Sequence, residues 1–203
     1  MHSFVNRVGS PRLLGTVVIA AWAMYFTMIS LSNIFDALKA MDVLGNGFDF
    51  ASGNWSFMQD TVAIYGTPDW LTGILFAGAI VLEVAVAALC WYALGSRLSD
   101  SPVASAASRA AVTSALVVWT AFVFMEEIFI AYGVESTHWM LFVASAISFG
   151  LLYLVDRPRE LAQAGERGGA DEAERRVLDV RRHVLVRHGE EGLREREHAA
   201  PHN

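Results

Sequence analysis

The fold is decided by residues 71–94, LTGILFAGAIVLEVAVAALCWYAL, in which Glu83 is the single acidic or basic residue. At a rise of about 1.5 Å per residue, a helix of this length covers roughly 35 Å, which exceeds the hydrocarbon core of a bilayer at about 30 Å. We therefore expect a membrane-spanning helix. A carboxyl group at mid-depth costs on the order of 3 kcal/mol, so Glu83 is expected to face protein or water rather than lipid.

Three further apolar runs are candidate spans, at about residues 13–32, 110–131 and 139–155. The first is expected to be a retained signal-anchor helix, because it is longer than the apolar core of a usual signal peptide and no clear cleavage site follows it. The sequence therefore predicts an all-α, integral membrane four-helix bundle over residues 1–155.

Residues 156–203 form a charged tail with ten Lys or Arg against eleven Asp or Glu. A capping-box pattern at Asp171 and Glu174, followed by a stripe of valine and leucine, predicts a helix over about 171–188. This stripe would suit self-association or docking on a partner. Because the tail arginines alternate with acids, there is no basic stripe, and no nucleic-acid partner is expected.

Between the first two spans lies a polar loop, residues 33–70, that is rich in aspartate and glycine. Within it, the segment NWSFMQDTVAIYG places Met58, Val62 and Tyr65 at helical spacing, with Asn54 in position to cap the helix. We predict a short helix that lies on the membrane surface.

The basic residues predict the orientation, since Lys and Arg are retained on the cytoplasmic side. Arg7 and Arg12 precede the first span, Arg97 and Arg109 lie between the second and third, and all others except Lys39 follow the fourth. The prediction is a multi-pass protein of the plasma membrane with both termini cytoplasmic, a cytoplasmic helical tail and the acidic loop outside.

Each span has one face that is expected to meet the other helices. In the second span, Glu83 shares this face with Phe76, Ala79, Ile80, Val86, Ala87 and Cys90. The other seams are Thr16, Ala20, Ala23, Thr27 and Ser30 in the first span, Thr113, Val117, Thr120, Phe124 and Glu127 in the third, and His138, Leu141, Ser145, Ser148 and Leu152 in the fourth. Glu126 points about 100° away from Glu127, so Glu127 is predicted to be interior and Glu126 to meet headgroups, water or a partner.

The acidic residues suggest an approach from the outer surface. Asn33 and Asp36 lie in the loop at the outer end of the first span, Glu127 lies about 6 Å down and Glu83 about 18 Å down, while His138 stands at the outer edge of the fourth span. A descending series of carboxylates would suit entry of protons or small cations. It would equally suit a half-pore, or a neutral Glu83 that is hydrogen-bonded to the next helix and purely structural.

Other chemistries lack support in the sequence. No hydrolase, nucleotide-binding or metalloprotease motif is present, so we expect no enzymatic activity. We expect no haem, since no span has an internal histidine pair, and no metal, since His198 and His202 in the tail have no companions. Cys90, the single cysteine, excludes an internal disulfide and is expected to be a packing residue.

Over residues 13–155, the order of these features resembles a family of small bacterial integral membrane proteins of unknown function. The residues that match its motifs are Asn33 and Asp36, Asn54 and Phe57, Glu83 with Ala88, Leu89 and Cys90, and Glu127 with Trp139 beyond it. A weaker similarity, through Tyr65-Gly66-Thr67-Pro68 and Glu83, is to DoxX-like four-helix membrane proteins. Both resemblances imply four spans, and neither implies a known activity.

Together these features predict a small polytopic membrane protein that is an accessory or binding subunit of a membrane complex, as a homo-oligomer or with other subunits. The alternative is conduction or transport of protons or small cations through Asp36, Glu127 and Glu83. Four helices joined by short loops, with a series of acids that reaches only half depth, favour the accessory role.

Overall fold

A computed structural model describes residues 9–45, 47–158, 161–162, 164–165 and 169. Four of its helices are long and apolar enough to cross a membrane: α2 (Pro11–Ala40), α4 (Asp69–Leu98), α5 (Ala104–Phe129) and a fourth membrane-length helix, Tyr132–Pro158. Two short elements, α3 (Asn54–Val62) and the 3-10 helix η1 (Ala63–Tyr65), lie between α2 and α4. The predicted all-α bundle of four long helices is confirmed.

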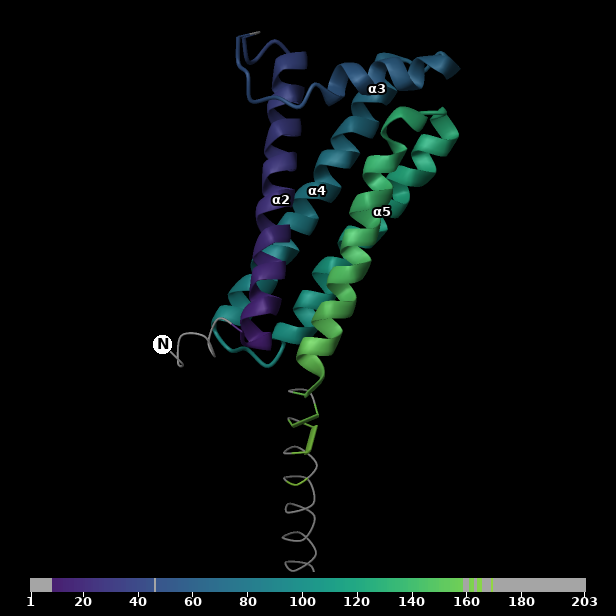
Figure 1. Cartoon of the computed structure of the whole chain (residues 1–203). Helices are drawn as coiled ribbons and strands as arrows, with labels where there is room; N and C mark the ends of the chain where they lie inside the picture. The colour runs from purple at the N-terminus through teal and green to yellow at the C-terminus, as the bar shows by residue number, and fades with distance from the viewer. Residues whose placement is uncertain (1–8, 46, 159–160, 163, 166–168, 170–203) are drawn as a thin grey trace, which may run out of the picture. The chain divides into compact units, whose positions relative to one another are not determined.

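The helices pack side by side within the compact unit Met1–Asp156. In Figure 1, α4 lies between α2 and α5, and the fourth membrane-length helix runs beside α5. We call the end that holds residues 41–68 the loop end and the end that holds Arg12 and Arg97 the arginine end. At the loop end, α3 lies across the ends of the long helices (Figure 1). The predicted tail helix over 171–188 falls outside the described residues.

The long helices extend beyond the apolar runs of the sequence. Helix α2 continues to Ala40 and therefore includes Asn33 and Asp36, which we had assigned to the loop. Helix α4 continues to Leu98, past the expected end at residue 94. Hydropathy underestimates these helices because their terminal turns carry polar side chains that are buried against neighbouring segments, where they find hydrogen-bond partners.

The interior of the bundle consists of small and aromatic side chains. Phe76, Glu83, Val86, Ala87 and Cys90 are buried on α4, so the predicted inner face of this helix is confirmed, although Ala79 and Ile80 are only half-buried. On α2, the predicted Ala23 and Ser30 are buried, together with Ile19 and Phe26. On the fourth membrane-length helix, Ser145 and Leu152 of the predicted seam have no exposed surface.

The predicted inner face of the third span was wrong. Val117 and Phe124 are 63% and 66% exposed, whereas the buried side chains of α5 include Ala104, Ser108, Ala111 and Ala115. These small residues recur every three or four positions, which brings one helix backbone close to another. The hydroxyls of Thr113 and Thr120 were the reason for predicting the seam that contains Val117 and Phe124. The hydroxyl of Thr120, however, donates a hydrogen bond to Leu116 O of its own helix at 2.7 Å.

The predicted helix in the loop is present as α3, but its predicted cap was wrong. The N-cap residue is Gly53, in the left-handed conformation at φ 76°, and it makes no side-chain capping bond. The side chain of Asn54 is instead directed to α2, where it donates a hydrogen bond to Asn33.

Candidate functional site: buried carboxyl groups in the loop half of the bundle

The first buried acid is Glu83, which is 3% exposed in the middle of α4. Its two carboxyl oxygens accept hydrogen bonds from Asn33 Nδ2 on α2, at 2.9 and 2.8 Å. Asn33 is itself 4% exposed. The two residues therefore satisfy each other across the α2–α4 interface, which is how an acid in a membrane helix is expected to be stabilised.

A chain of hydrogen bonds joins Glu83 to the loop. Asn33 Oδ1 accepts from Asn54 Nδ2 at 2.8 Å, so α2, α3 and α4 meet at one amide. One turn further along α2, Asp36 Oδ2 accepts from the backbone N–H of Trp55 at 2.7 Å and from Ser52 Oγ at 3.2 Å. We call Asn33, Asp36, Ser52, Asn54 and Glu83 the loop network. It fixes the start of α3 on the bundle and leads inward to Glu83.

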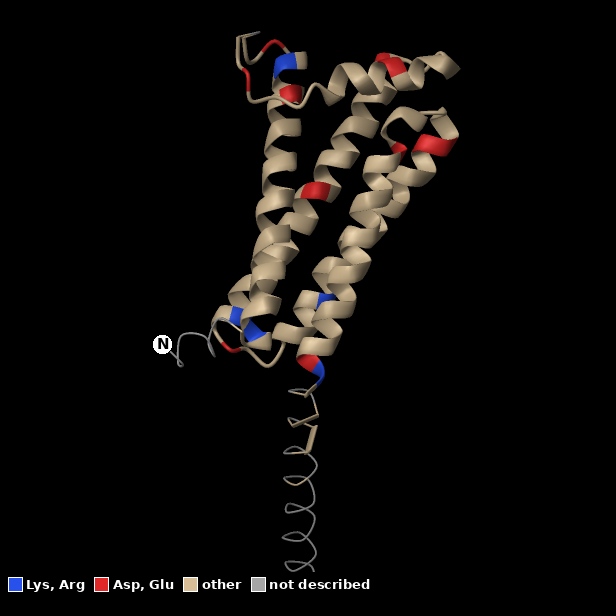
Figure 2. Cartoon of the chain, viewed as in Figure 1, with Lys and Arg blue, Asp and Glu red and all other residues tan. Residues whose placement is uncertain are grey.

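Figure 2 shows the charges on the ribbon: acids are concentrated at the loop end, and one acidic position lies in α4 far from both of its ends. Since α4 has Asp69 in its first turn, that inner position is Glu83. The sequence analysis named Asn33, Asp36 and Glu83 as candidates, and all three are buried in the structure, but it did not indicate that Asn33 contacts Glu83 directly.

The second buried acid is Glu126, which is 6% exposed near the end of α5. One carboxyl oxygen, Oε1, is in a short contact with Nδ1 of His138 on the fourth membrane-length helix. The imidazole stacks on Trp119, with ring centroids 5.8 Å apart and planes 18° apart, and Phe122 meets it edge-on at 5.1 Å. We call Glu126, His138, Trp119 and Phe122 the histidine cluster.

The prediction for the two neighbouring glutamates was therefore wrong: Glu126 faces the interior, and Glu127 is exposed. The physical reason is the face that α5 buries. Glu126 lies seven residues after Trp119 and eleven after Ala115, which are both buried, and these intervals return to the same side of a helix. Glu127 thus does not belong to an inward series with Asp36 and Glu83.

The histidine cluster contains unsatisfied polar atoms. In the part of the chain that the structure describes, the buried side-chain atoms without a hydrogen-bond partner are Trp119 Nε1 and Glu126 Oε2. Buried polar groups are nearly always paired, so each exception requires an explanation.

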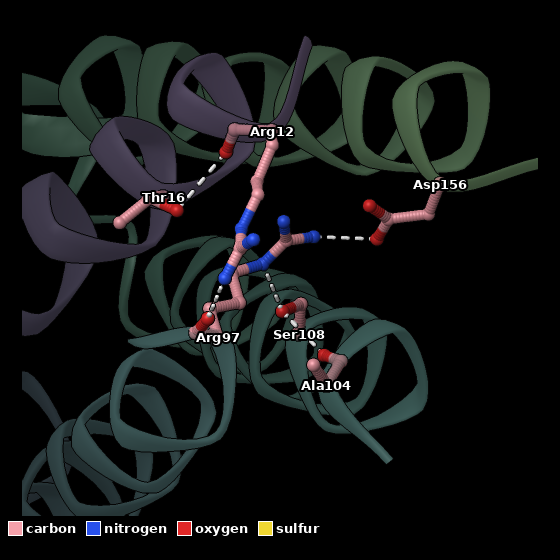
Figure 3. Close-up of polar contacts among 6 residues, drawn as sticks. All are labelled: Arg12, Thr16, Arg97, Ala104, Ser108 and Asp156. Carbon is pink, nitrogen blue, oxygen red and sulfur yellow. Dashed lines mark hydrogen bonds and ion pairs between the residues drawn. The ribbon is translucent and has the colours of Figure 1, made fainter. Parts of the chain in front are cut away.

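A third buried group, which the sequence analysis missed, lies at the arginine end. Arg97 is 4% exposed; its Nε donates to Ser108 Oγ at 2.6 Å and its Nη2 to Asp156 Oδ2 at 2.5 Å. Asp156 is 5% exposed, so this is a buried ion pair between α4 and the fourth membrane-length helix. Figure 3 shows the Arg97 guanidinium between Ser108 and Asp156, with Arg12 reaching the Arg97 carbonyl at 3.3 Å.

Close approach of α2 completes this arrangement. A Cβ atom on Gly15 would lie 2.5 Å from Arg97 Nη1, so a larger residue here would force the guanidinium to shift. The sequence analysis had placed Arg97 between the second and third spans and Asp156 at the start of the charged tail. A usable signal was the seven-residue interval that links Phe76, Glu83, Cys90 and Arg97 on one face of α4.

Between the two polar ends the interior is mainly apolar, although Ser145 of the fourth membrane-length helix is also buried there. The core contains Ile19, Trp22, Ala23 and Phe26 of α2, Val86, Ala87, Cys90 and Ala93 of α4, and Ala111, Val112, Ala115, Val118 and Trp119 of α5. Below Glu83 the buried residues of α4 are Val86, Ala87, Cys90 and Ala93 until Ser96 and Arg97 are reached. The loop network therefore ends at Glu83.

These features define a multi-pass membrane protein by helix length and hydropathy, with a four-helix bundle that buries Glu83 and Glu126. Among the described residues, no group of three or more His, Cys, Asp or Glu side chains is placed to hold a metal ion. No protein-family model, curated protein or solved structure matches the chain.

Proposed function

We propose that this protein is a non-catalytic accessory or binding subunit of a membrane complex. In this proposal the loop network fixes the loop and α3 onto the outer end of the bundle. The observation that carries the proposal is that the hydrogen-bonded chain from Asn54 through Asn33 stops at Glu83. Beyond that acid, the buried side chains of α4 are apolar from Val86 to Ala93. A polar path that enters one side of a bundle and does not continue supports binding or assembly better than conduction.

The second candidate function is conduction of protons or small cations. It is favoured by one observation: Asp36, Glu83 and Glu126 are all buried in the loop half of the bundle. The route would run from Asp36 through the loop network to Glu83, without Glu127. It would need an exit through the apolar core toward the arginine end.

Two measurements distinguish these functions: ion flux through the purified protein, and the mass of the native assembly. For purified protein in liposomes, we expect no proton or sodium flux above that of empty liposomes, for wild type and for Glu83→Gln alike. In native lipid particles, we expect a mass well above the 22.2 kDa of one chain, because an accessory subunit is held by further copies or by other subunits. Flux in wild type that is lost in Glu83→Gln would support conduction and contradict the accessory role.

We further propose the orientation in which both termini and the arginine end are cytoplasmic. Arg12 lies in the first turn of α2, Arg97 in the last turn of α4 and Arg109 in the second turn of α5, so these three basic residues are near helix ends. In a Cys90→Ala background, a membrane-impermeant thiol reagent applied to intact cells is expected to label Gly47→Cys and not Pro102→Cys. The reverse pattern would invert the orientation.

The family resemblances remain part of this proposal. They are supported by the contact of Asn33 with both Asn54 and Glu83, since all three residues belong to the motifs that match.

A further inference from the structure

Two side-chain amides connect the surface of the loop end to the buried acid of α4. Asn54 is exposed in the first turn of α3, whereas Asn33 is 4% exposed and Glu83 is 3% exposed. Asn54 Nδ2 donates to Asn33 Oδ1 at 2.8 Å, and Asn33 Nδ2 donates to the two oxygens of Glu83 at 2.9 and 2.8 Å. Every hydrogen bond of this chain therefore runs inward, from the surface to the carboxyl group.

The inward direction fits one proton state of Glu83 and not the other. An ionised carboxylate only accepts hydrogen bonds, whereas a protonated carboxyl group has an O–H that needs an acceptor. Asn33 presents an N–H to both oxygens, and residues 40–96 contain no lysine or arginine. Because an unpaired buried donor is costly, protonation of Glu83 requires its partner to change.

The amide of Asn33 can make that change almost without altering its shape. The nitrogen and oxygen of a primary amide are nearly equal in size, so a half-turn of the amide exchanges donor and acceptor at nearly the same positions. After such a turn, Asn33 Oδ1 faces Glu83 and Asn33 Nδ2 faces Asn54. Asn54 must then turn as well, so that its Oδ1 accepts from Asn33. Since Asn54 is exposed, its displaced N–H group can meet water.

We propose that Asn33 and Asn54 form a reversible relay that reports the proton state of Glu83 at the surface of the loop end. With Glu83 ionised, both links of the relay donate inward; with Glu83 protonated, both donate outward. Coupling of this kind is reciprocal, so a group that binds Asn54 as a donor or as an acceptor also shifts the proton equilibrium of Glu83.

The surrounding elements hold other ionisable groups, but these have other partners, face outward or lie further along the bundle. On α2, Asp36 accepts from the first turn of α3 and Tyr25 is 37% exposed. The others are Asp60, which is exposed on α3; Cys90, seven residues beyond Glu83 on α4; and Glu126 on α5, which contacts His138 of the fourth membrane-length helix. Among the described residues, the side chain that is hydrogen-bonded to Glu83 is Asn33.

The relay depends neither on the accessory role nor on conduction, because it is an orientation within the isolated protein. It is tested by solid-state NMR on the full-length protein in liposomes, with ¹⁵N in the asparagine side chains and ¹³C in glutamate. The dipolar contact between Asn33 Nδ2 and Glu83 Cδ reports the inward direction, and the chemical shift of Glu83 Cδ reports its proton state. Glu83→Gln identifies both signals by removing them.

Between about pH 5 and about pH 10, a range that includes the titration of buried glutamates, we expect the dipolar contact to follow the proton state of Glu83. The contact should be strong when Glu83 is ionised and largely lost when it is protonated, because the amide nitrogen then faces Asn54. A contact that stays constant while Glu83 titrates would overturn the relay. So would a Glu83 Cδ shift that does not change over this range.

A substitution at the surface tests the outer link. Asn54→Asp replaces the donor with a group that only accepts, so it should lower the ratio of inward to outward Asn33 about two- to tenfold at a given pH, the factor that one hydrogen bond contributes. The matched control is Ser56→Asp, which adds the same charge at an exposed position of α3 whose hydroxyl bonds to Gly53 O, and it should leave the contact unchanged. Equal effects of the two variants would contradict the relay. If Asn54→Asp does not fold, the titration of the wild type decides the question.

Discussion

Replacing Arg97 with alanine is expected to lower the free energy of unfolding by about 3 to 5 kcal/mol, the cost of leaving one member of a buried ion pair unpaired. Arg97 is 4% exposed and Asp156 is 5% exposed, so water does not reach the carboxylate that would remain. Ser108 Oγ would also lose its donor. The measurement is an unfolding titration with a denaturing detergent, followed by circular dichroism.

A matched control is available at the same end of the bundle. Arg12 and Asp100 form an ion pair at 2.7 Å, but their side chains are 52% and 49% exposed, so Arg12→Ala should cost less than about 1 kcal/mol. The double variant Arg97→Met with Asp156→Leu should be far more stable than Arg97→Ala, since no buried charge remains. Equal stability of Arg97→Ala and Arg12→Ala would show that Arg97 is not buried as described.

Gly15 offers an independent probe of the same contact. Gly15→Ala places a methyl group 2.5 Å from Arg97 Nη1 and should also destabilise the bundle. Gly78→Ala, where nothing lies within 4 Å, should be neutral or slightly stabilising because alanine favours helix.

Replacing Asn33 with leucine is expected to cost about 2 to 3 kcal/mol, because it removes the donor to Glu83 from an interior that offers the carboxyl group no water. It also removes the acceptor of Asn54, so the start of α3 loses one of its contacts with α2. The same unfolding titration measures the loss. Protease sensitivity of residues 41–53 should rise with it.

The interpretation is tested by a double-mutant cycle. Glu83→Leu alone should also destabilise the protein, since it leaves the Asn33 amide unpaired, but the double variant should cost much less than the sum of the two. Asn54→Ala removes only the outer contact and should have a smaller effect. Simple additivity of the Asn33 and Glu83 variants would contradict a direct pairing.

The sequence could predict much of the fold because hydropathy acts locally. Each long apolar run had to become a helix, since a backbone in lipid must satisfy its own hydrogen bonds. The inner face of α4 followed from the cost of exposing Glu83 to lipid, and the importance of Asn33 and Asp36 followed from polar side chains at the end of a span. The inner face of α5 did not follow, because two periodic patterns, one with threonines and one with alanines, were both available.

The candidate site depended on contacts between distant segments. Asn33 and Glu83 are separated by 50 positions, and Arg97 and Asp156 by 59, so neither pairing has a signature within a single helix. The choice between Glu126 and Glu127 depended on a rotation of α5 that the packing of Ala111 and Ala115 fixes.

The sequence by itself determined that this chain forms four membrane-length helices with an acid in the second, because lipid penalises every unpaired backbone group and every exposed charge in the same way wherever it occurs. Only the tertiary structure decided which polar groups pair, since that depends on how each helix is rotated and how closely its neighbours approach. Small residues such as Gly15 and Ala115 set those distances, and the partners of Glu83, Glu126 and Arg97 follow from them.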